Sequence, residues 1–486
     1  MIDLTINERV LEKSIGRARE RNIVIPTLSQ MRRPDTIPSA IRERLTNVGL
    51  WDVDPLNLFR IGWRNEPKPH GGLFGGVNHV ELPRELTGVR ARIIGLVGKW
   101  FPTGAHKVGA AFGCLVPRLV TGQFDPSSQK AVWPSTGNFC RGGAYDSALL
   151  GCASVAILPE GMSQERFDWL SQIAGEVIKT PGSESNVKEI FDKCWELRRS
   201  GQDVVIFNQF EELGNYLWHH QVTGPAMAEL LEEILRPGDR YAGVVSSTGS
   251  AGTIACGDYL KVRFPESKIV ASEALECPTL LSNGFGAHRI EGIGDKHVPW
   301  IHNVRNTDMV TAIADEAPMA LLRVFNEPTG RKYLQTVGVP QDVVERLDLL
   351  GISGISNLVS AVKLAHWFEL DEHDVVLTVF TDSMDLYQSR LRELTEERGE
   401  LDAATAAAAH ERWLLGASTD HMEELTYPSR KRIHNLKYYT WVEQQGKTYD
   451  EIQAQWYDPT YWSSVPACVQ TLDELIVEFN RRTGLG

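Results

Sequence analysis

Short runs of β-branched and aliphatic residues alternate with amphipathic stretches through the middle of the chain. Apolar residues recur at helical spacing in 187–199 and 217–235, which therefore predict helices. Near-continuous apolar strands that alternate with helices indicate parallel sheets covered on both faces, so the pattern predicts an α/β protein. The predicted strands are 92–97, 130–133, 153–158, 176–179, 203–207, 242–247, 268–273 and 374–380.

The two ends of the chain have a different pattern. Residues 1–80 are rich in arginine, proline and asparagine and carry few strand signals. Residues 391–486 are charged and helical at first and aromatic later, and the alanine-rich tract 402–409 predicts one ordinary helix. No internal repeat is visible. We therefore expect the α/β region to carry an extension at each end.

Composition is that of an ordinary globular protein, with 42% hydrophobic, 23% charged and 8% aromatic residues. The 486 residues are enough for two or three domains. A formal net charge of −13 argues against nucleic acid or an anionic membrane as a partner. Neither a long apolar run nor a secretory signal is apparent, so a cytoplasmic protein is expected.

The cysteines are scattered along the chain and none stands at metal-ligand spacing, which predicts reduced thiols and no metal site. Most are expected to be small core residues. Only Cys140 lies inside a motif, where a packed residue is favoured over a functional thiol. The seven positions are 114, 140, 152, 194, 256, 277 and 468.

Lys107 stands out because small residues surround it in Trp-Phe-Pro-Thr-Gly-Ala-His-Lys-Val-Gly-Ala-Ala (100–111). Glycine and alanine neighbours allow a flat ring to approach the backbone, and a lysine there is suited to attack an aldehyde. Most lysines are solvated surface charges, so this interpretation depends on the rest of the chain.

A first glycine-rich turn, Pro-Ser-Thr-Gly-Asn-Phe-Cys-Arg-Gly-Gly-Ala (134–144), directly follows a predicted strand. It offers hydroxyls, an amide and free backbone N–H groups at what should be a helix N-terminus. That arrangement suits a carboxylate, although an ordinary capped helix start has the same pattern.

A second turn, Val-Ser-Ser-Thr-Gly-Ser-Ala-Gly-Thr-Ile (245–254), again lies between a strand and a helix. Its small residues and hydroxyls resemble a phosphate cradle. It lacks the lysine of a nucleotide-binding P-loop and the dinucleotide fingerprint, so a phosphate carried by another compound is favoured. A third segment, 378–389, is a strand end followed by polar residues.

Together these segments resemble the fold-type II (tryptophan synthase β-like) pyridoxal-phosphate enzymes, especially the cysteine synthase and cystathionine β-synthase branch. The resemblance covers about 95–390, and seven motifs stand in family order. They are Pro-Thr-Gly-Ala-His-Lys (102–107), Ser-Thr-Gly-Asn (135–138), Asn-Gln-Phe (208–210) with His220 and Thr-Gly-Pro (223–225), the turn 249–253, Glu-Gly-Ile-Gly (291–294), Gly-Ile-Ser-Gly (351–354), and Thr-Asp-Ser (381–383) with Tyr387.

The resemblance implies two three-layer αβα domains with mostly parallel sheets, the cofactor in the cleft between them, and helical extensions at both ends. It also implies a homodimer, in which the C-terminal segment could wrap the partner or cap the cleft. The expected divisions are an N-terminal extension 1–80, a large cofactor-binding domain 81–129 and 231–390, a small mobile substrate-loop domain 130–230, and a C-terminal extension 391–486.

The resemblance further implies pyridoxal 5'-phosphate as the cofactor, with Lys107 forming the Schiff base and later shuttling the α-proton. Asn138 is expected to contact the phenolic oxygen of the ring, and Ser383 its pyridine nitrogen. A one-residue shift would place Asp382 there instead. A hydroxyl partner makes the ring a milder electron sink, which favours loss of a β-substituent. The phosphate is assigned to Gly249, Ser250, Ala251, Gly252 and Thr253.

The substrate carboxylate is assigned by the same resemblance to Ser135, Thr136, the backbone at Phe139, and Gln209. The chain departs from the family here, because Phe139 stands where a threonine is common. Ala251 in place of a usual glycine is a milder departure. The first of these changes bears on substrate identity.

The expected function is β-elimination or β-replacement on a serine- or cysteine-like amino acid, through an enzyme-bound aminoacrylate. Two alternatives stay open. One is threonine synthase-like or hydroxy-amino-acid dehydratase chemistry. The other is a non-catalytic cofactor-binding or regulatory protein, which the retention of Lys107, Asn138 and Ser383 argues against. A small amino acid is the expected partner in either enzymatic case.

Overall fold

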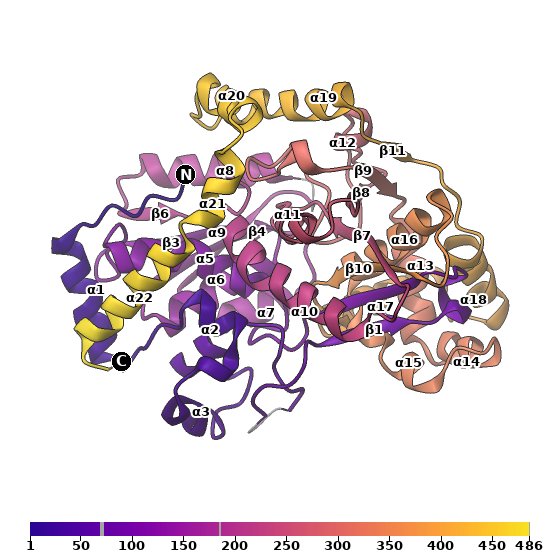
Figure 1. Cartoon of the computed structure of the whole chain (residues 1–486), viewed down its shortest axis with the longest axis horizontal. Helices are drawn as coiled ribbons and strands as arrows, with labels where there is room; N and C mark the ends of the chain where they lie inside the picture. Colours follow the sequence, from indigo (N-terminus) through magenta and orange to yellow (C-terminus); the bar gives the residue numbers. More distant parts are fainter. Residues whose placement is uncertain (69–71, 184–185, 486) are drawn as a thin grey trace.

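A computed structural model describes residues 1–68, 72–183 and 186–485. Within these residues the chain forms one seven-stranded and one four-stranded sheet, with helices on both faces (Figure 1). This arrangement confirms the predicted α/β class with mostly parallel sheets.

The large sheet is parallel in its interior and antiparallel at its two edges. Its interior strands are apolar and buried on both faces; all residues of the central strand 374–380 are buried. In sheet order the strands are β1 (His79–Leu82), β2 (Arg92–Val97), β10 (Asp374–Phe380), β7 (Arg240–Ser247), β8 (Lys268–Ala274), β9 (Met309–Ile313) and β11 (Met422–Glu424).

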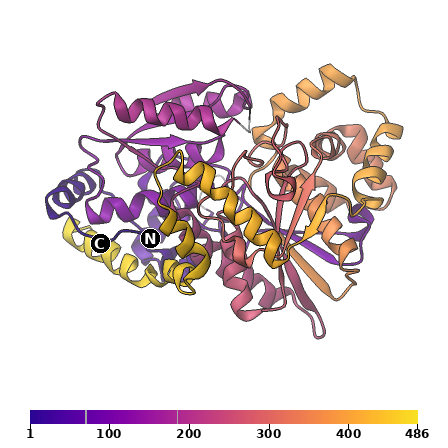
Figure 2. The ribbon, with the colours of Figure 1, turned by 90° about the horizontal axis from the view of Figure 1, so that it is seen from above.

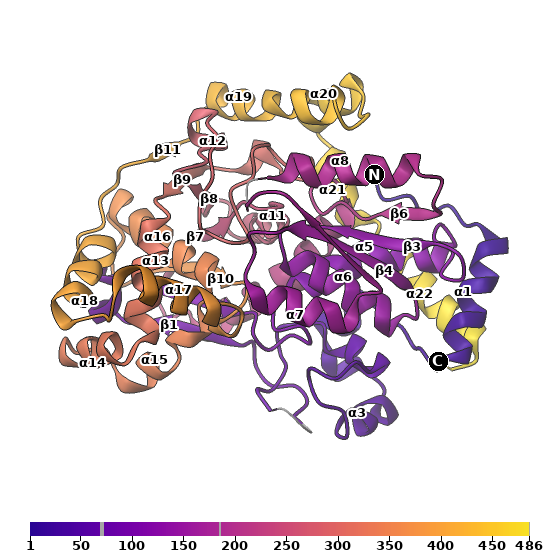
Figure 3. The same cartoon turned by 180° about the vertical axis from the view of Figure 1, so that it is seen from behind.

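The small sheet is parallel throughout (Figure 3). Three helices connect its strands: α6 (Asn138–Leu149), α7 (Gln164–Ile173) and α8 (Val187–Arg199). The strand order is β5 (Glu176–Thr180), β4 (Ala153–Pro159), β3 (Lys130–Pro134) and β6 (Val204–Ile206). All eight predicted strands are confirmed across the two sheets.

One predicted helix is divided. Residues 217–235 cover the end of α9 (Leu213–Trp218), a π-helical turn His219–Thr223, and α10 (Gly224–Ile234). The extra residue per turn changes the helical phase just before Pro225, where the backbone lacks an N–H donor. Helix α5 (Lys107–Thr121) packs against α6 and α9 although it directly follows β2.

The remaining helices of the large-sheet region are α11 (Ile254–Arg263), α12 (Thr279–Ser282), α13 (Glu316–Asn326), α14 (Pro328–Thr336), α15 (Gln341–Glu345) and α16 (Ile352–Trp367). Of these, α11 and α16 pack against the sheet, and α13 packs on α16 as part of an outer layer with α14 (Figure 1).

Both extensions are helical, and the two ends of the chain lie side by side (Figure 2). The predicted helix at 402–409 is confirmed as α18. The N-terminal helices are α1 (Glu8–Glu20), α2 (Leu28–Arg32), α3 (Ser39–Leu45) and, before β2, α4 (Arg84–Thr87). The C-terminal ones are α17 (Gln388–Arg398), α18 (Ala403–His410), α19 (Tyr427–Lys437), α20 (Tyr449–Tyr457), α21 (Tyr461–Ala467) and α22 (Val469–Thr483).

The aromatic part of the C-terminal extension packs on its own chain. Trp441 is buried and its Nε1 donates to the carbonyl of Val298 at 2.8 Å. The buried Lys437 Nζ donates to the carbonyls of Trp300 and His302 at 2.9 and 2.8 Å. These contacts fix the extension to the segment 298–302, which follows one of the predicted site loops.

Among the described residues, no helix is both long and apolar enough to cross a membrane. Within the same residues no group of histidine, cysteine or acidic side chains could hold a metal ion.

Candidate active site

Lys107 is the first residue of α5 and lines a cavity at the carboxyl ends of strands from both sheets. The structure brings most of the predicted site residues to this one cavity. The turn between the lining residues Gly249 and Thr253 contains Ser250, Ala251 and Gly252. Ser383 is buried and does not line the cavity. The predicted residues that line the cavity are Lys107, Ser135, Thr136, Asn138, Phe139, Gln209, Gly249 and Thr253.

Four helices begin at this cavity. Helices α5 and α6 start at Lys107 and Asn138, Thr253 is the N-cap of α11, and Ser353 is the second residue of α16. Each N-terminus carries partial positive charge and N–H groups without partners inside the helix. Their convergence makes the cavity suited to a ligand with more than one anionic group.

The Lys107 amine contacts the turn 249–253, which we call the phosphate cradle. Its Nζ donates to Ser250 Oγ at 3.0 Å, and Asn215 Nδ2 donates to the same oxygen at 3.0 Å. Asn215 belongs to α9, so the cradle and the lysine are joined through a helix that sequence reasoning did not connect with the site.

The cradle is held by close backbone approaches. A Cβ added to Gly249 would lie 2.4 Å from the carbonyl oxygen of Gly292, and one added to Gly252 would lie 2.1 Å from Asn215 Oδ1. Ala251 adopts a φ of +60°, a left-handed conformation that costs an L-residue about 1 kcal/mol or more. This backbone conformation explains why a glycine is usual at that position.

His106 ties the lysine segment to the end of β10. Its backbone N–H donates to the carbonyl of Thr381 at 3.2 Å, and its Nε2 lies 3.2 Å from Thr381 Oγ1. Complete burial, with a smaller contribution from the Lys107 ammonium, lowers the pKa of His106 well below its usual value. His106 is therefore a neutral neighbour of the amine.

Residues 135–138, which we call the carboxylate loop, join β3 to α6. Ser135 Oγ accepts from Gln209 Nε2 and from the N–H of Gly137, both at 3.2 Å. The loop therefore brings together a hydroxyl, an amide side chain and the N-terminus of α6, three groups that suit a carboxylate.

The side chain of Phe139 is packed into the core. It is 1% exposed, and its ring meets that of Trp133 edge to face with centroids 5.4 Å apart. This ring stands where the family commonly has a hydroxyl. A bound carboxylate would therefore have to accept its hydrogen bonds from the loop, from Gln209 and from the backbone of α6.

Cys140 is also packed, which confirms the structural interpretation of this residue. Its side chain is fully buried, with Sγ 2.9 Å from the carbonyl oxygen of Gly137. Burial raises the pKa of the Cys140 thiol to about 12, so the reactive thiolate is scarce near neutral pH. All seven cysteines are free, as predicted.

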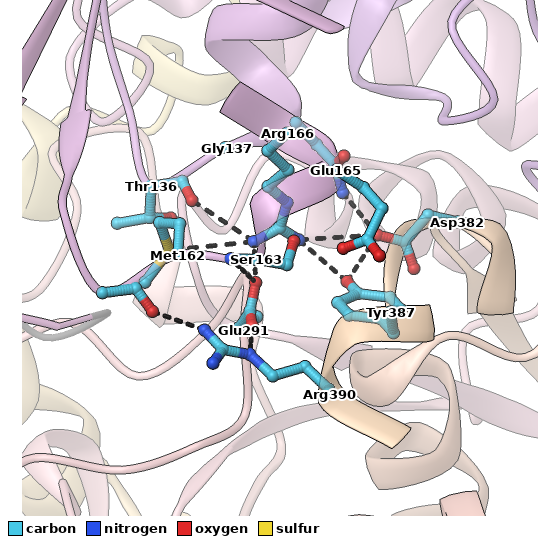
Figure 4. A network of polar contacts seen from close by, with 12 residues as sticks. Thr136, Gly137, Met162, Ser163, Glu165, Arg166, Glu291, Asp382, Tyr387 and Arg390 are labelled. Atoms are coloured by element: carbon cyan, nitrogen blue, oxygen red, sulfur yellow. Dashed lines mark hydrogen bonds and ion pairs between the residues drawn. The ribbon is translucent and has the colours of Figure 1, made fainter. Parts of the chain in front are cut away.

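The carboxylate of Asp382 is turned toward α6 and α17. Its Oδ2 accepts from Asn138 Nδ2 at 2.6 Å and from Tyr387 Oη at 2.7 Å (Figure 4). Thr381, which sequence reasoning did not select as a site residue, lines the cavity. Ser383 is 1% exposed and precedes the short 3-10 turn Met384–Leu386.

Asp295 is a second residue that sequence reasoning missed. It follows two glycines with positive φ, Gly292 at +99° and Gly294 at +79°, in a loop that lines the cavity. Burial raises the pKa of Asp295 to about 8, and the Lys107 ammonium opposes this rise. Its Oδ2 has no hydrogen-bond partner among the residues the structure describes. Only the glycines of this loop gave a sequence signal.

Comparison with known proteins is consistent with this geometry. The family described as "Pyridoxal-phosphate dependent enzyme" matches residues 100–326. A probable cysteine synthase of Bacillus subtilis is 31% identical over 216 residues, which are 44% of this chain and 68% of that protein. The chain belongs to the family of pyridoxal-phosphate-dependent enzymes.

The relatives also confirm the predicted branch of the family. Cystathionine β-synthase of Saccharomyces cerevisiae is 25% identical over 319 residues, which are 64% of this chain and 59% of that protein. A solved hydrogen sulfide-producing enzyme of Fusobacterium nucleatum has the same fold, with a TM-score of 0.54 at 21% identity. That likeness covers 64% of this chain and 95% of the other.

The cavity fits pyridoxal phosphate, the cofactor of this family. A lysine lies beside a cradle whose glycines leave no room for a Cβ, and four helix N-termini surround an anion-sized space. The cradle hydroxyls and α11 would hold the phosphate, and Lys107 would hold the aldehyde carbon.

Proposed function

We propose that this pyridoxal-phosphate enzyme catalyses β-elimination or β-replacement on a serine- or cysteine-like amino acid. The observation that carries the proposal is the position of Lys107 between two anion sites, the phosphate cradle and the carboxylate loop. The reacting Cα of an amino acid carries a carboxylate. The loop would bind this carboxylate and the cradle the cofactor phosphate, and together they would orient the Cα toward Lys107.

When bound, the cofactor supplies the electron sink that acidifies the α-carbon of the substrate. The amine of Lys107 then accepts the α-proton, because it is the basic group that lines the cavity next to the cradle. The β-substituent leaves with its bonding electrons. Either a second nucleophile bonds to Cβ, or water releases the carbon skeleton as a keto acid together with ammonia.

Binding of the substrate carboxylate falls to Ser135, Thr136, Gln209 and the backbone at Phe139. Gln209 and Ser135 already share a hydrogen bond at 3.2 Å, so two donors are held together before substrate arrives. Such preorganisation reduces the ordering that binding requires. The proposed phosphate contacts are those of Gly249, Ser250, Ala251, Gly252 and Thr253.

Asp295 follows Gly292 and Ile293, which line the cavity, and its own side chain is buried. Because burial raises its pKa to about 8, the carboxyl is protonated at neutral pH and is able to donate to a departing β-substituent. We include it in the proposal as the general acid, with Lys107 as the base.

Ser383 remains the proposed partner of the pyridine nitrogen, and Asn138 that of the phenolic oxygen. The Oδ2 atom of Asp382 is engaged by Asn138 and Tyr387, whereas its Oδ1 has no hydrogen-bond partner among the residues that the structure describes, so Ser383 stays the choice that the family resemblance makes. Ser383→Asp should shift the products away from β-elimination. An unchanged product ratio would count against this assignment.

A homodimer in the cytoplasm completes the proposal, as the family resemblance implies. Light scattering of the purified chain should give twice the monomer mass of 54.3 kDa. A monomeric mass at all concentrations would remove the dimer from the proposal.

The decisive experiment supplies a panel of β-substituted amino acids, with and without sulfide, and measures keto acid, ammonia and thiol amino-acid products. The purified protein should carry the visible absorbance of bound cofactor, and Lys107→Ala should lose this band and about 1,000-fold or more of the activity. Turnover of threonine or a γ-substituted substrate alone would overturn the β-specific function. A protein that binds cofactor but turns over nothing would overturn catalysis.

A further inference from the structure

A buried polar cluster lies where the small sheet meets the large one (Figure 4). Arg166, on α7, is at its centre with a fully buried side chain. Around it are Glu291, Asp382 and Tyr387 from segments that follow strands of the large sheet, and Arg390 from α17. None of these residues lines the cavity at Lys107, so the cluster lies behind the site.

Arg166 joins two buried carboxylates of the large-sheet region. Its guanidinium forms an ion pair with Glu291, donates to Tyr387 Oη at 2.8 Å, and lies 3.8 Å from Asp382 Oδ2. Glu291 also accepts from Arg390 Nε at 2.6 Å. Buried charges of this kind are stable only when they are paired. Burial raises the pKa of Asp382, and the Arg166 guanidinium opposes the rise.

The same guanidinium contacts the carboxylate loop of the small-sheet region. Its Nη1 donates to the carbonyl of Thr136 at 3.5 Å, and a Cβ on Gly137 would lie 2.7 Å from Arg166 Cδ. Gly137 also has a φ of +154°, so a side chain at this position would be strained as well as too close to the arginine. Asn138, the next residue, donates to Asp382, which is itself held by the cluster.

The adjacent turn of α7 docks onto α17. Glu165 accepts from the N–H of Ser389 at 2.8 Å and from its Oγ at 2.6 Å. Arg390 reaches back to the carbonyl of Gly161. Gly161 and Glu165 therefore contact α17 in addition to the contacts of Arg166, so the segment 161–166 is docked on the large-sheet region at several points.

We propose that Arg166 is a positioning residue that docks the carboxylate loop onto the half of the active site built by the large sheet. It acts through Thr136 and Gly137 directly and through Asp382 on Asn138. The identity of the loop as the carboxylate site rests on the proposed function. If the small-sheet region moved away from the large-sheet region, Glu291 and Asp382 would lose the positive charge of Arg166. The pairing of these charges therefore favours the state in which the loop is docked.

The test compares Arg166→Gln with a matched control, Arg323→Gln. Arg323 is also a buried arginine paired with a glutamate, Glu327, but it lies on α13 and contacts no cavity residue. Both variants should lose thermal stability. Only Arg166→Gln should raise the KM for the amino acid, by 10-fold or more, while the cofactor content and kcat stay within about threefold of the wild type. Arg166→Lys, which keeps the charge, should recover part of the KM.

Two results would overturn the proposal. The first is an equal change of KM in the two glutamine variants. The second concerns Arg166→Gln/Glu291→Gln, which removes one of the two carboxylates that face Arg166 and should recover part of the stability without recovering KM. Recovery of both together would show that Arg166 acts only through stability.

A further measurement does not depend on turnover. In the cofactor-free protein, a protease should cut within 160–183 faster in Arg166→Gln than in Arg323→Gln, because the docked segment is released. Equal cleavage would overturn the docking role. If the wild type turned over no amino acid but showed this difference in cleavage, the proposed function would fail while the docking role held.

Discussion

The phosphate cradle and the carboxylate loop both connect a strand to a helix, yet they are held in different ways. The cradle is tightly packed, since side chains on Gly249 or Gly252 would collide with the carbonyl of Gly292 or with the Asn215 amide. The carboxylate loop is held by hydrogen bonds from side chains that are distant in sequence, among them Gln209 and Arg166. In the proposed function the cradle would hold the cofactor and the loop the substrate, so only the loop would have to admit and release a ligand at each turnover.

The largest effect should come from filling the cradle. Gly252→Ala would place a Cβ 2.1 Å from Asn215 Oδ1 and displace the amide that holds Ser250. Overpacking of about 1–3 kcal/mol corresponds to a loss of roughly 5- to 150-fold in cofactor affinity. Titration of apo-protein with cofactor, followed by absorbance, measures this. Affinity within twofold of the wild type would show that the cradle is softer than its packing indicates.

Removing a support of the carboxylate loop should affect the substrate and spare the cofactor. Gln209→Ala deletes the donor to Ser135 and one proposed carboxylate contact, a hydrogen bond to a charged group worth about 1.5–2 kcal/mol. We expect kcat/KM to fall about 10- to 30-fold with unchanged cofactor affinity. Exposed Gln202→Ala is the control. Equal losses of cofactor and substrate affinity would contradict the separation of the two sites.

The stability of the folded protein is expected to change with pH because of Asp295. Its pKa of about 8 in the folded protein exceeds the value of 3.8 expected for an exposed carboxyl. Between these values the folded state binds the extra proton, so this group's contribution to stability falls as pH rises from about 4 to about 8. Asp295→Asn should therefore gain stability relative to the wild-type apo-protein as pH rises from about 4 to about 8, by about 1.4 kcal/mol for each pH unit.

Titration of Asp295 should also appear in catalysis, as a decrease of kcat on the alkaline side of the pH profile. As the general acid, Asp295 should lose activity as pH rises through about 8, and Asp295→Asn should lack that decrease, at a lower plateau. Unfolding by denaturant and steady-state kinetics measure the two effects separately. A stability difference that does not change with pH would remove the titrating carboxyl from the explanation.

The smallest effect is expected from Ala251→Gly. Relief of the left-handed strain is partly offset by the greater flexibility of glycine in the unfolded chain, so we expect a gain of about 0.5 kcal/mol. Cofactor affinity should stay within threefold. A destabilised variant would mean that the Ala251 methyl makes a packing contribution larger than its backbone strain, and the melting temperature shows which applies.

The sequence alone was sufficient to predict the features that depend only on neighbouring residues. Most interior strands follow from their apolar runs, and Lys107 and the cradle follow from the small residues around them. The polar edge strands β1 and β11 were missed, since four and three residues with exposed faces carry little pattern. The strand β9, although apolar, was also missed, because five residues do not distinguish a strand from a buried helical turn.

The rest of the site depends on long-range pairing. Arg166 lies on a helix with an ordinary pattern of charges, and its partners Glu291 and Tyr387 are 125 and 221 residues further along the chain. Nothing near Arg166 distinguishes it from a solvated arginine. Asp295 lies next to a recognised motif and Thr381 inside one, but only the folded chain brings Thr381 and the loop before Asp295 to the cavity of Lys107. When distant segments bury a charged residue, the sequence around that residue shows no pattern from which its burial could be predicted.

The pairing of the two chain ends has a consequence for synthesis. Helix α22 packs against α1 and α5, and Arg19 Nε donates to the carbonyl of Thr483 at 3.0 Å. Helix α5 carries Lys107 at its start, so the helix behind the active-site amine is covered in part by a segment that begins more than 350 residues after that lysine. During synthesis the faces of α1 and α5 that pack on α22 therefore stay uncovered until α22 has been made.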